Sequence, residues 1–455
     1  MYLVYSLLMG LAAILLTPYW LIQGIRHGKY LSNLSERLGF SYPALAKLPA
    51  ARMDAIWLHA VSVGEVLAGL TLARRLKERF PERPLVISTT TITGQALAKE
   101  RMPFADAVIY FPLDWGFCAK RALAAVKPAL VVVLETEIWP NFLRAASWNN
   151  VPVIFVSGRI SDRSFARSQT WLSIVGFFLR PFLKDALGRA AGFWMQSEKD
   201  AERVRALGAP AEKVTVGGNL KYDAALPENT PLAEWLDAEL ARSGRRPLIV
   251  AGSVVATEEP LALIAFGVAQ GEHRKALLVL APRKPERFEA AAAFTTESQR
   301  KFVRRTSLKV AAPSGVAGAG TETQIPDDVQ VLLLDSIGEL ASLYRLADGV
   351  FIGGSLVESG GHNILEPAAF GKVAVFGESM ENFAEIARRF VAADAALQVA
   401  SPEDAGVSWI ELLREPERNA RMGEAARRLV EESRGATERA VEAIRGILHG
   451  ERKSG

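Results

Sequence analysis

Strand-like apolar runs alternate with helical patterns along most of the chain, and they do so in two series. The first series contains "AIWLHA", "PLVISTTT", "AVIYFP", "ALVVVLE", "VPVIFVS" and "GFWMQS". The second contains "PLIVAGS", "ALLVLAP", "VQVLLLD", "GVFIGG" and "VAVFG". Runs of β-branched residues that are each followed by a helix are typical of parallel α/β sheets. The alternation therefore predicts two doubly wound domains with a boundary near Thr230, and a small, Gly-rich segment, "AAPSGVAGAGTETQIPDD", as a mobile surface insertion.

The N-terminal stretch Tyr2–Ile25 contains no charged side chain, and an apolar helix of that length can span or enter a bilayer. A cleaved signal peptide is the alternative, but no Lys or Arg precedes the run and no clear A-x-A site follows it. The first cations, Arg26 and Lys29, follow the run, so the positive-inside rule places the remainder in the cytoplasm. We expect a membrane anchor over 1–28, an N-terminal Rossmann-like domain over 29–230 and a C-terminal Rossmann-like domain over 231–455.

Composition removes several classes of function. The 455 residues include one cysteine, Cys118, which excludes an internal disulfide. Neither C-x-x-C nor H-E-x-x-H occurs, so the usual zinc motifs are missing. The formal charge is only +4, and no long basic or aromatic-interleaved stripe predicts nucleic-acid binding. We expect neither a metal site nor a nucleic-acid partner.

Ligands of open α/β sheets bind beyond the carboxyl ends of the strands, and the stretch "SVGE" lies at such a place. Its spacing matches a capping box, in which Ser62 caps a helix and Glu65 bonds back to the backbone NH of Ser62. Gly64, however, allows a ligand to approach the backbone, and a carboxylate at this turn can act as a general base. The pattern leaves both roles open for Glu65.

A second acidic stretch, "ETEIWPN", follows another apolar run. In extended geometry Glu135 and Glu137 point to one face, and their crowding would raise the pKa of at least one of them. A paired acid/base site is one interpretation. The other is a helix N-terminus that carries acids suited to its dipole.

A third stretch, "FIGGSLVESGGHNILEPAAFG", has two glycine pairs, Gly353–Gly354 and Gly360–Gly361, before a helix that we expect near Ile364. Backbone NH groups and a helix N-terminus of this kind predict a cradle for a nucleotide phosphate, although an ordinary tight connection would look similar. Glu366, three residues after Asn363, either completes a cap or binds a ribose diol. Because the chain lacks a P-loop, and no G-x-G-x-x-G opens its first βα unit, a nucleotide-sugar is favoured over ATP or a dinucleotide.

The motifs "HAVSVGE", "ETEIWPN", "GNLKYD", "APRKPERF" and "GGSLVESGGHNILEPAAFGK" resemble, in this order and spacing, the Kdo (3-deoxy-D-manno-octulosonic acid) transferases of lipopolysaccharide synthesis. The resemblance covers nearly the whole chain. It implies an α/β protein of the GT-B glycosyltransferase fold, with two Rossmann-like domains facing a cleft and an N-terminal membrane-anchor helix. On this resemblance, 29–230 is the acceptor domain and 231–455 is the nucleotide-sugar-binding domain. It also implies an inverting transfer of Kdo from CMP-Kdo to a lipid A precursor (lipid IVA) at the cytoplasmic face of the inner membrane, without a metal or cofactor.

The same resemblance implies roles for single residues. Glu65 would be the base, and Glu135 and Lys221 would stabilise the transition state, although Lys221 by itself looks like an ordinary surface lysine. The expected nucleotide contacts are Pro282, Arg283, Ile337, Gly338, Glu339, Asn363, Ile364, Leu365 and Glu366. Two stretches depart from the family pattern, Ser253–Glu258, where a Thr-His pair is expected, and Glu378–Ser379, where Pro-His is usual. Donor contacts at these two places are left open.

Two other functions stay open on the sequence alone. A different GT-B enzyme that uses a uridine-nucleotide sugar, such as a lipid-linked N-acetylglucosaminyl transferase or an epimerase, would share the architecture and the phosphate cradle. A non-catalytic, membrane-bound nucleotide-binding scaffold is the second, because a fold does not guarantee chemistry. The sequence does not determine the number of Kdo units added, the acyl pattern of the acceptor or the oligomeric state.

Overall fold

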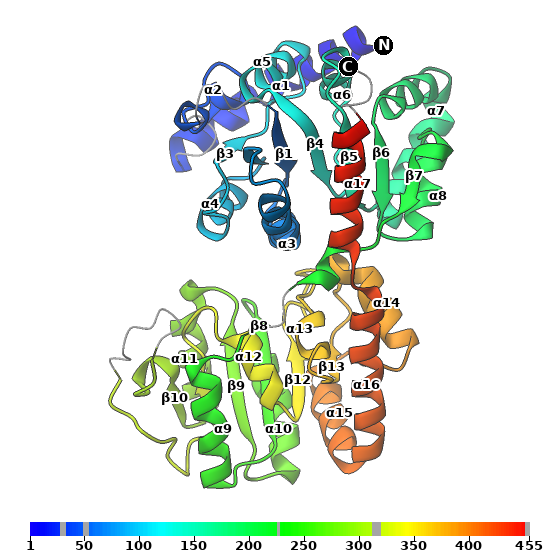
Figure 1. The fold of residues 1–455 in the computed structure, drawn as a ribbon. Coiled ribbons are helices and arrows are strands. Elements are labelled where there is room, and N and C mark those ends of the chain that lie inside the picture. Colours follow the sequence, from blue (N-terminus) through cyan, green and yellow to red (C-terminus); the bar gives the residue numbers. More distant parts are fainter. Residues whose placement is uncertain (28–32, 49–53, 225–227, 312–319, 451–455) are drawn as a thin grey trace. The chain divides into compact units, whose positions relative to one another are not determined.

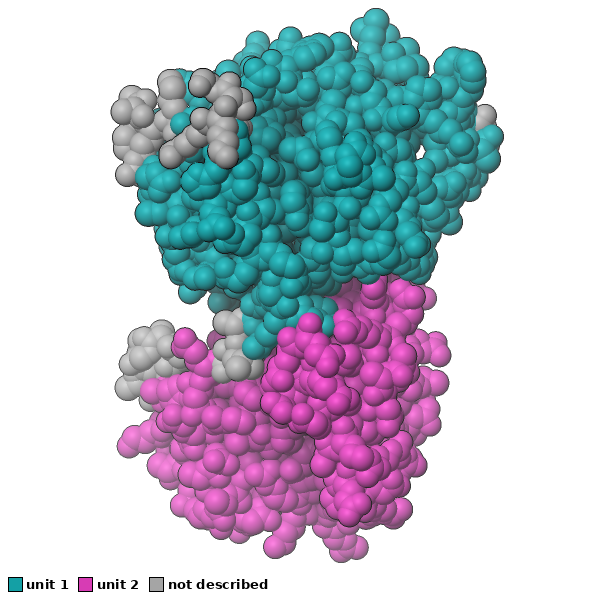
Figure 2. All heavy atoms as spheres, turned by 45° about the vertical axis from the view of Figure 1, so that its right-hand side comes forward, with its two compact units in different colours: residues 1–225, 433–455 teal, residues 226–432 magenta. Residues whose placement is uncertain are grey.

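The computed structural model describes the chain except for residues 28–32, 49–53, 225–227, 312–319 and 451–455. The chain divides into two compact units, unit 1 (Met1–Ala225 and Ser433–Gly455) and unit 2 (Leu226–Glu432), which are coloured separately in Figure 2. Each unit contains one seven-stranded sheet whose paired strands are all parallel, flanked by helices (Figure 1). The two predicted parallel α/β domains are confirmed.

The sheet of unit 1 has the strand order β3-β2-β1-β4-β5-β6-β7. Its strands are β1 (Ala55–His59), β2 (Leu85–Thr89), β3 (Ala107–Tyr110), β4 (Pro128–Leu134), β5 (Val153–Gly158), β6 (Gly192–Met195) and β7 (Val214–Val216). Helices of this unit are α2 (Leu34–Arg37), α3 (Val63–Arg79), α4 (Ile92–Arg101), α5 (Gly116–Val126), α6 (Pro140–Trp148), α7 (Asp162–Gly188) and α8 (Glu198–Ala206). The first six strands were predicted from the sequence. The strand β7, a short edge strand with two exposed residues, was not.

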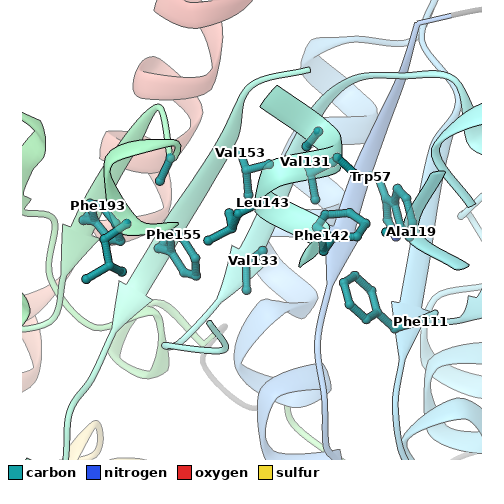
Figure 3. Close-up of a cluster of buried hydrophobic side chains, with 14 of the residues drawn as sticks. Trp57, Phe111, Ala119, Val131, Val133, Phe142, Leu143, Val153, Phe155 and Phe193 are labelled. Atoms are coloured by element: carbon teal, nitrogen blue, oxygen red, sulfur yellow. The ribbon is translucent and has the colours of Figure 1, made fainter. Parts of the chain in front are cut away.

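Successive side chains of a strand point to opposite faces of the sheet. Both faces of this sheet are buried. Trp57 lies in an aromatic cluster on one face, where its ring stands 5.4 Å from that of Phe142 and nearly perpendicular to it (Figure 3). The next residue, Leu58, belongs to a second cluster that includes residues of α3. A sheet covered on both faces leaves its strand ends as the place for polar chemistry.

The N-terminal helix α1 (Tyr2–His27) belongs to unit 1 and contacts it through polar and aromatic side chains. Tyr2 donates its hydroxyl to Asp185 at 2.6 Å, Tyr5 donates to Asp114 at 3.0 Å, and the ring of Phe182 lies 5.1 Å from that of Tyr2. Large apolar side chains of α1 that remain exposed are Leu3, Val4, Leu7, Leu8, Leu11, Ile14 and Leu15. Within the described residues, no helix has both the length and the apolar character that crossing a membrane requires. The membrane anchor predicted over 1–28 is not confirmed.

The sheet of unit 2 has the strand order β10-β11-β9-β8-β12-β13-β14. Its strands are β8 (Leu248–Val254), β9 (Leu277–Pro282), β10 (Phe302–Arg304), β11 (Val331–Leu333), β12 (Gly349–Ile352), β13 (Ala374–Phe376) and β14 (Ala396–Gln398). Its helices are α9 (Pro231–Ser243), α10 (Glu259–Glu272), α11 (Phe288–Glu297), α12 (Leu340–Leu343), α13 (Leu365–Ala368), α14 (Ala384–Ala392), α15 (Pro402–Arg414) and α16 (Pro416–Ser433). The edge strands β10 and β14 were missed, and the core of the predicted insertion, 312–319, lies outside the described residues.

The last helix, α17 (Ala436–Gly450), belongs to unit 1, and this corrects the predicted domain boundaries. The predicted second domain ran unbroken from 231 to 455. Ala440, Val441 and Ile444 of α17 are instead buried in the same cluster as Leu58 of β1. The sequence of an amphipathic helix shows that one face is apolar but not which sheet that face covers. The packing of α17 on the first sheet therefore could not be predicted from the pattern.

Candidate active site

Glu65 lies in the first turn of α3, directly beyond β1. Its Oε2 accepts the backbone NH of Val61 at 2.8 Å, and its Oε1 accepts the hydroxyl of Ser62 at 3.1 Å. Ser62 is the N-cap residue of α3, but its side chain makes no capping hydrogen bond. Of the two roles left open, the capping box is not formed in either half: Ser62 does not cap the helix, and Glu65 bonds to Val61 rather than to the NH of Ser62.

The surroundings of Glu65 suit a base that works near neutral pH. Glu65 is only 7% exposed, and burial raises the pKa of its carboxyl group to about 7. The Val61 NH and the Ser62 hydroxyl lower the pKa, whereas the charges of Glu135 and Glu137 raise it. A carboxylate with a pKa near the working pH can accept a proton and later release it.

Lys221 and Glu135 form an ion pair beside Glu65. Glu135 follows β4 with φ 56°, and its Oε1 lies 3.9 Å from Lys221 Nζ. Burial lowers the pKa of Lys221, while the charges of Glu135 and Glu65 raise it. The pKa of Glu137 is raised, as predicted for this acidic pair, mainly by burial and then by Glu135. The Lys221 side chain is only 17% exposed, so it is not the solvated surface lysine that the sequence alone suggested.

Three polar residues at the same sheet edge were not predicted: Ser157, Arg159 and Gln196. Arg159 follows β5, its charge lowers the pKa of Lys221, and its backbone NH bonds to Thr136 at 2.8 Å. Ser157 has φ 57°, and its Oγ accepts from Gln196 Nε2 at 3.2 Å. All three lie where β5 and β6 end, a signal that was available for these strands as it was for "ETEIWPN".

In unit 2, Pro282 ends β9 and Arg283 follows it. Burial raises the pKa of Glu366, and the charge of Arg283 opposes this rise. Asn363 Nδ2 donates to Glu366 Oε1 at 3.2 Å. The structure thus brings Arg283, Asn363 and Glu366 together, as predicted for nucleotide contacts, with Ile364 and Leu365 in the same turn.

His362 belongs to this group and was also missed. Burial, reinforced by the charge of Arg283, lowers the pKa of this imidazole to about 4. Its Nε2 is buried and has no hydrogen-bond partner within the described part of the chain. A neutral imidazole beside a guanidinium can offer one donor or one acceptor, depending on its tautomer.

The turn Ile337–Gly338–Glu339 offers less to a ligand than predicted. Glu339 is fully buried and its carboxylate is bound by Arg305, whose Nε and second terminal nitrogen donate at 2.7 and 2.9 Å. Ile337 is 53% exposed and Gly338 has φ 95°. Any nucleotide contact from this turn therefore comes from the Ile337 side chain or from backbone atoms, not from the Glu339 carboxylate.

The first glycine pair, Gly353–Gly354, was predicted to cradle a phosphate, and this is wrong because a carboxylate of the chain occupies the position. Fully buried Glu258 accepts backbone NH groups from Gly354 at 2.6 Å and from the next two residues at 3.0 Å. It also accepts from Val255 at 3.2 Å. Four NH groups point at one carboxylate and leave none of these donors for a ligand.

The backbone NH groups of the second pair, Gly360–Gly361, also form hydrogen bonds within the chain. Gly360 donates to Ser379 Oγ at 2.9 Å, and Gly361 donates to the carbonyl of Gly354 at 2.7 Å. Gly361 has φ 67°, and a Cβ there would clash with Met380 Sδ. The glycine is required by backbone conformation and close packing. Ser379 also accepts the backbone NH of Ser359 at 3.2 Å.

Lys221 and Arg159 in unit 1 and Arg283 in unit 2 supply positive charge at the two groups of candidate residues. Among the residues that the structure describes, no three or more His, Cys, Asp or Glu side chains are grouped so that they could hold a metal ion.

Comparisons with known proteins bear on the family and the fold. A family model for 3-deoxy-D-manno-octulosonic-acid transferase (kdotransferase) matches residues 32–224, and one for glycosyl transferases group 1 matches residues 320–429. The 3-deoxy-D-manno-octulosonic acid transferase of Haemophilus influenzae is 32% identical over 93% of this chain and 93% of its own length. That of Bordetella pertussis is 34% identical over 89% of this chain and 90% of its own length.

Two solved structures share the fold at low identity. The structure of S. aureus MnaA with UDP is 15% identical, with a TM-score of 0.53 over 87% of this chain and 97% of that one. A glycosyltransferase from Rickettsia africae is 11% identical, with a TM-score of 0.52 over 88% of this chain and 99% of that one. Together with the two parallel α/β units, these likenesses support the GT-B fold.

Proposed function

The chain belongs to the 3-deoxy-D-manno-octulosonic acid (Kdo) transferase family, and we propose that it transfers Kdo from CMP-Kdo to a lipid A precursor, lipid IVA. It is a glycosyltransferase of lipopolysaccharide biosynthesis. The observation that carries the proposed mechanism is Glu65, a buried carboxylate at the carboxyl edge of a parallel sheet, with its pKa raised to about 7. A group of that pKa is half ionised near neutral pH and is suited to take a proton from a sugar hydroxyl.

In the proposed reaction an acceptor hydroxyl oxygen attacks the anomeric carbon of Kdo. The bond from that carbon to the phosphate oxygen breaks, CMP leaves with the bonding electrons, and the hydroxyl proton goes to Glu65. One displacement inverts the configuration at the anomeric carbon. Lys221, whose ammonium lies 3.9 Å from Glu135, stabilises the negative charge that develops, and Glu135 keeps Lys221 protonated against the effect of burial.

The donor nucleotide is proposed to bind unit 2. Arg283 neutralises the phosphate, and the polar side chains of Asn363 and Glu366 are placed to bind the ribose. Further contacts come from Pro282, from backbone atoms of Ile337, Gly338 and Glu339, and from the backbone of Ile364 and Leu365. Fixed cations can neutralise a departing phosphate, so the proposal needs neither a metal nor a cofactor.

We place the enzyme at the cytoplasmic face of the inner membrane and assign the attachment to α1. Support comes from the uncharged run Tyr2–Ile25, from the cations that follow it and from the apolar side chains of α1 that stay exposed. An acceptor with acyl chains is itself held in a membrane, so attachment brings enzyme and acceptor to one surface.

Product analysis tests the donor and the acceptor together. The detergent-solubilised protein is incubated with CMP-Kdo and a tetra-acylated lipid A precursor, and products are analysed by mass spectrometry. We expect the precursor to gain one or more Kdo masses with release of CMP, and no product with a uridine-nucleotide sugar as donor. Thermal protection by UDP but not CMP would favour the alternative enzyme. Tight CMP binding without any turnover would favour the scaffold.

Membrane attachment is tested by replacing Leu7, Leu11 and Ile14, which are exposed on α1, with serine. We expect the variant to leave the membrane fraction while keeping its activity on a detergent-dispersed acceptor. Retention in the membrane fraction would assign the attachment to another part of the chain.

A further inference from the structure

Lys221 lies in the middle of a short segment, 217–223, that links β7 to the end of the first part of unit 1. Its last four residues form a short 3-10 helix, Leu220–Asp223. Leu220 and Tyr222 on either side of Lys221 are buried, so the lysine is the residue of this turn that is directed to Glu135. The position of the ammonium therefore depends on what holds the segment.

Both ends of the segment are held by the first turn of α17, although more than 200 residues separate them in the chain. At one end, the Asp223 carboxylate accepts the backbone NH of Gly435 at 2.7 Å and that of Thr437. At the other end, Arg439 Nε donates to the carbonyl of Gly217 at 2.8 Å. A carboxylate at a helix N-terminus satisfies free NH groups and interacts favourably with the helix dipole.

The middle of the segment approaches α17 closely. Gly218 has φ 88°, and a Cβ there would lie 2.6 Å from a terminal nitrogen of Arg439 and 3.3 Å from Ala436 Cβ. Leu220 donates its NH to Ser157 Oγ at 3.3 Å, which ties the segment to the end of β5. The turn that carries Lys221 is thus clamped between the sheet edge and the C-terminal helix.

The geometry points to Asp223 as a positioning residue for the transfer reaction: by capping α17, it sets the position of Lys221 against Glu135. The inference rests on the catalytic role proposed above for Lys221. Asp223, the last residue of "GNLKYD", then has a role distinct from that of Lys221. The helix α17 then contributes to the proposed active site of unit 1. Arg439 holds the other end of the segment and is a second positioning residue for Lys221.

A small displacement matters at this place. The Lys221 ammonium and the Glu135 carboxylate lie 3.9 Å apart in a mostly buried setting, where the energy of two charges depends strongly on distance. Misplacing a reacting or stabilising group by about 1 Å costs on the order of 100-fold in rate. Loosening the segment should therefore reduce turnover without touching the nucleotide residues of unit 2.

The test compares Asp223→Asn with Glu438→Gln in the detergent-solubilised full chain. Glu438 undergoes the same chemical change and lies in the turn of α17 that Asp223 contacts, but its side chain is exposed and bonds to Arg75. We expect Asp223→Asn to lower kcat by about 100-fold with an unchanged KM for CMP-Kdo, and Glu438→Gln to behave as the parent. Arg439→Gln should shift the same quantities in the same direction by less.

Lysine labelling gives a readout that does not depend on activity. Acetic anhydride labelling followed by mass spectrometry should show faster modification of Lys221 in Asp223→Asn, because the ammonium leaves its mostly buried position. Lys213, which donates to the carbonyls of Gly188 and Ala190 at 2.8 and 2.9 Å, is the internal control and should not change.

Unchanged labelling of Lys221, or equal acceleration at Lys213, would overturn the inference, the second because it indicates general loosening of unit 1. If Asp223→Asn does not fold, the Arg439→Gln protein decides by the same two measurements. Lys221→Met separates this inference from the proposed function. Near-native turnover of that variant would remove Lys221 from the mechanism, while the labelling result would still decide whether Asp223 positions it.

Discussion

Glu65 of unit 1 and Glu258 of unit 2 occupy corresponding places, since each follows the first strand of its sheet and lies at the start of the next helix. Their surroundings differ in the number of donors. Glu65 accepts one backbone NH and one hydroxyl. Glu258 accepts four backbone NH groups, one from its own turn and three from the loop after β12.

The difference indicates how one residue type in one topological position can suit two purposes. A carboxylate with four NH donors has its lone pairs filled and ties two loops together. A buried carboxylate with two donors keeps lone pairs free, and burial raises its pKa into the range in which it exchanges protons. On the proposed mechanism, the number of donors, rather than the presence of glutamate, separates the reactive carboxylate from the structural one.

The largest effect is expected from Glu65→Gln. If Glu65 is the base, turnover should fall by about 10² to 10⁴-fold, the usual contribution of positioned proton transfer. Glutamine keeps the size of the side chain and can still accept the Val61 NH. Initial rates with saturating CMP-Kdo, and CMP binding by calorimetry, make the measurement. Near-native turnover with a folded protein would place Glu65 beside Glu258 as a structural residue.

Glu258→Gln should act mainly on stability and donor binding. The amide NH2 would face NH groups that now point at a carboxylate oxygen, and unsatisfied buried groups cost about 1 to 3 kcal/mol each. We expect a lower melting temperature and a higher KM for CMP-Kdo, because the loop before Asn363 loses its support. The neighbouring Glu259→Gln, which keeps an acceptor for Arg287 but loses the charge of the ion pair, is the control and should lose less. A large drop in kcat at unchanged stability would contradict the assigned role.

A third effect concerns the pH dependence of stability. The pKa of Glu65 is raised from an ordinary 4.5 to about 7 in the folded protein, so the folded state binds the proton more tightly than the unfolded state. The group therefore costs nothing below about pH 4, and its cost grows to about 1 to 3 kcal/mol above pH 7. Glu65→Gln should be more stable than the parent at about pH 8 and equal to it near pH 4. Denaturant unfolding at both pH values measures this, and a variant that is less stable at pH 8 would show that the carboxylate stabilises the fold.

Ser62→Ala should give the smallest effect. The Ser62 hydroxyl donates to Glu65 Oε1 and lowers the pKa of that carboxyl. Its removal should move the acidic limb of the pH–rate profile for kcat/KM upward by at most about one pH unit, with little change in the maximal rate. A shift to lower pH would mean that the limb reports another group.

Much of the architecture followed from the sequence because long buried strands leave a strong apolar signal. The three strands that were missed, β7, β10 and β14, have three residues each and lie at sheet edges. Such strands carry too few apolar positions to be distinguished from loops. Glu65 and Glu135, beyond long strands, were found because parallel strands bring their carboxyl ends to one edge. Lys221 follows the missed strand β7 and was named only through the family resemblance.

The features that the sequence could not supply are those set by tertiary partners. The pattern of glycines before Asn363 is the same whether the backbone NH groups await a phosphate or are filled by Glu258. Only the position of α10 in space decides between the two. In the same way, "SVGE" has the spacing of a capping box, but burial of the turn decides that Glu65 bonds to Val61.

The return of α17 to unit 1 has a consequence for biosynthesis. The first and larger part of unit 1 is translated before unit 2. The cluster around Leu58 nevertheless lacks Ala440, Val441 and Ile444 until α17 has been translated. Unit 2 is one continuous stretch, Leu226–Glu432, and all its strands are available earlier. The half of the molecule that leaves the ribosome first is therefore finished last, and its nascent form carries an uncovered apolar face that chaperones can bind while translation continues.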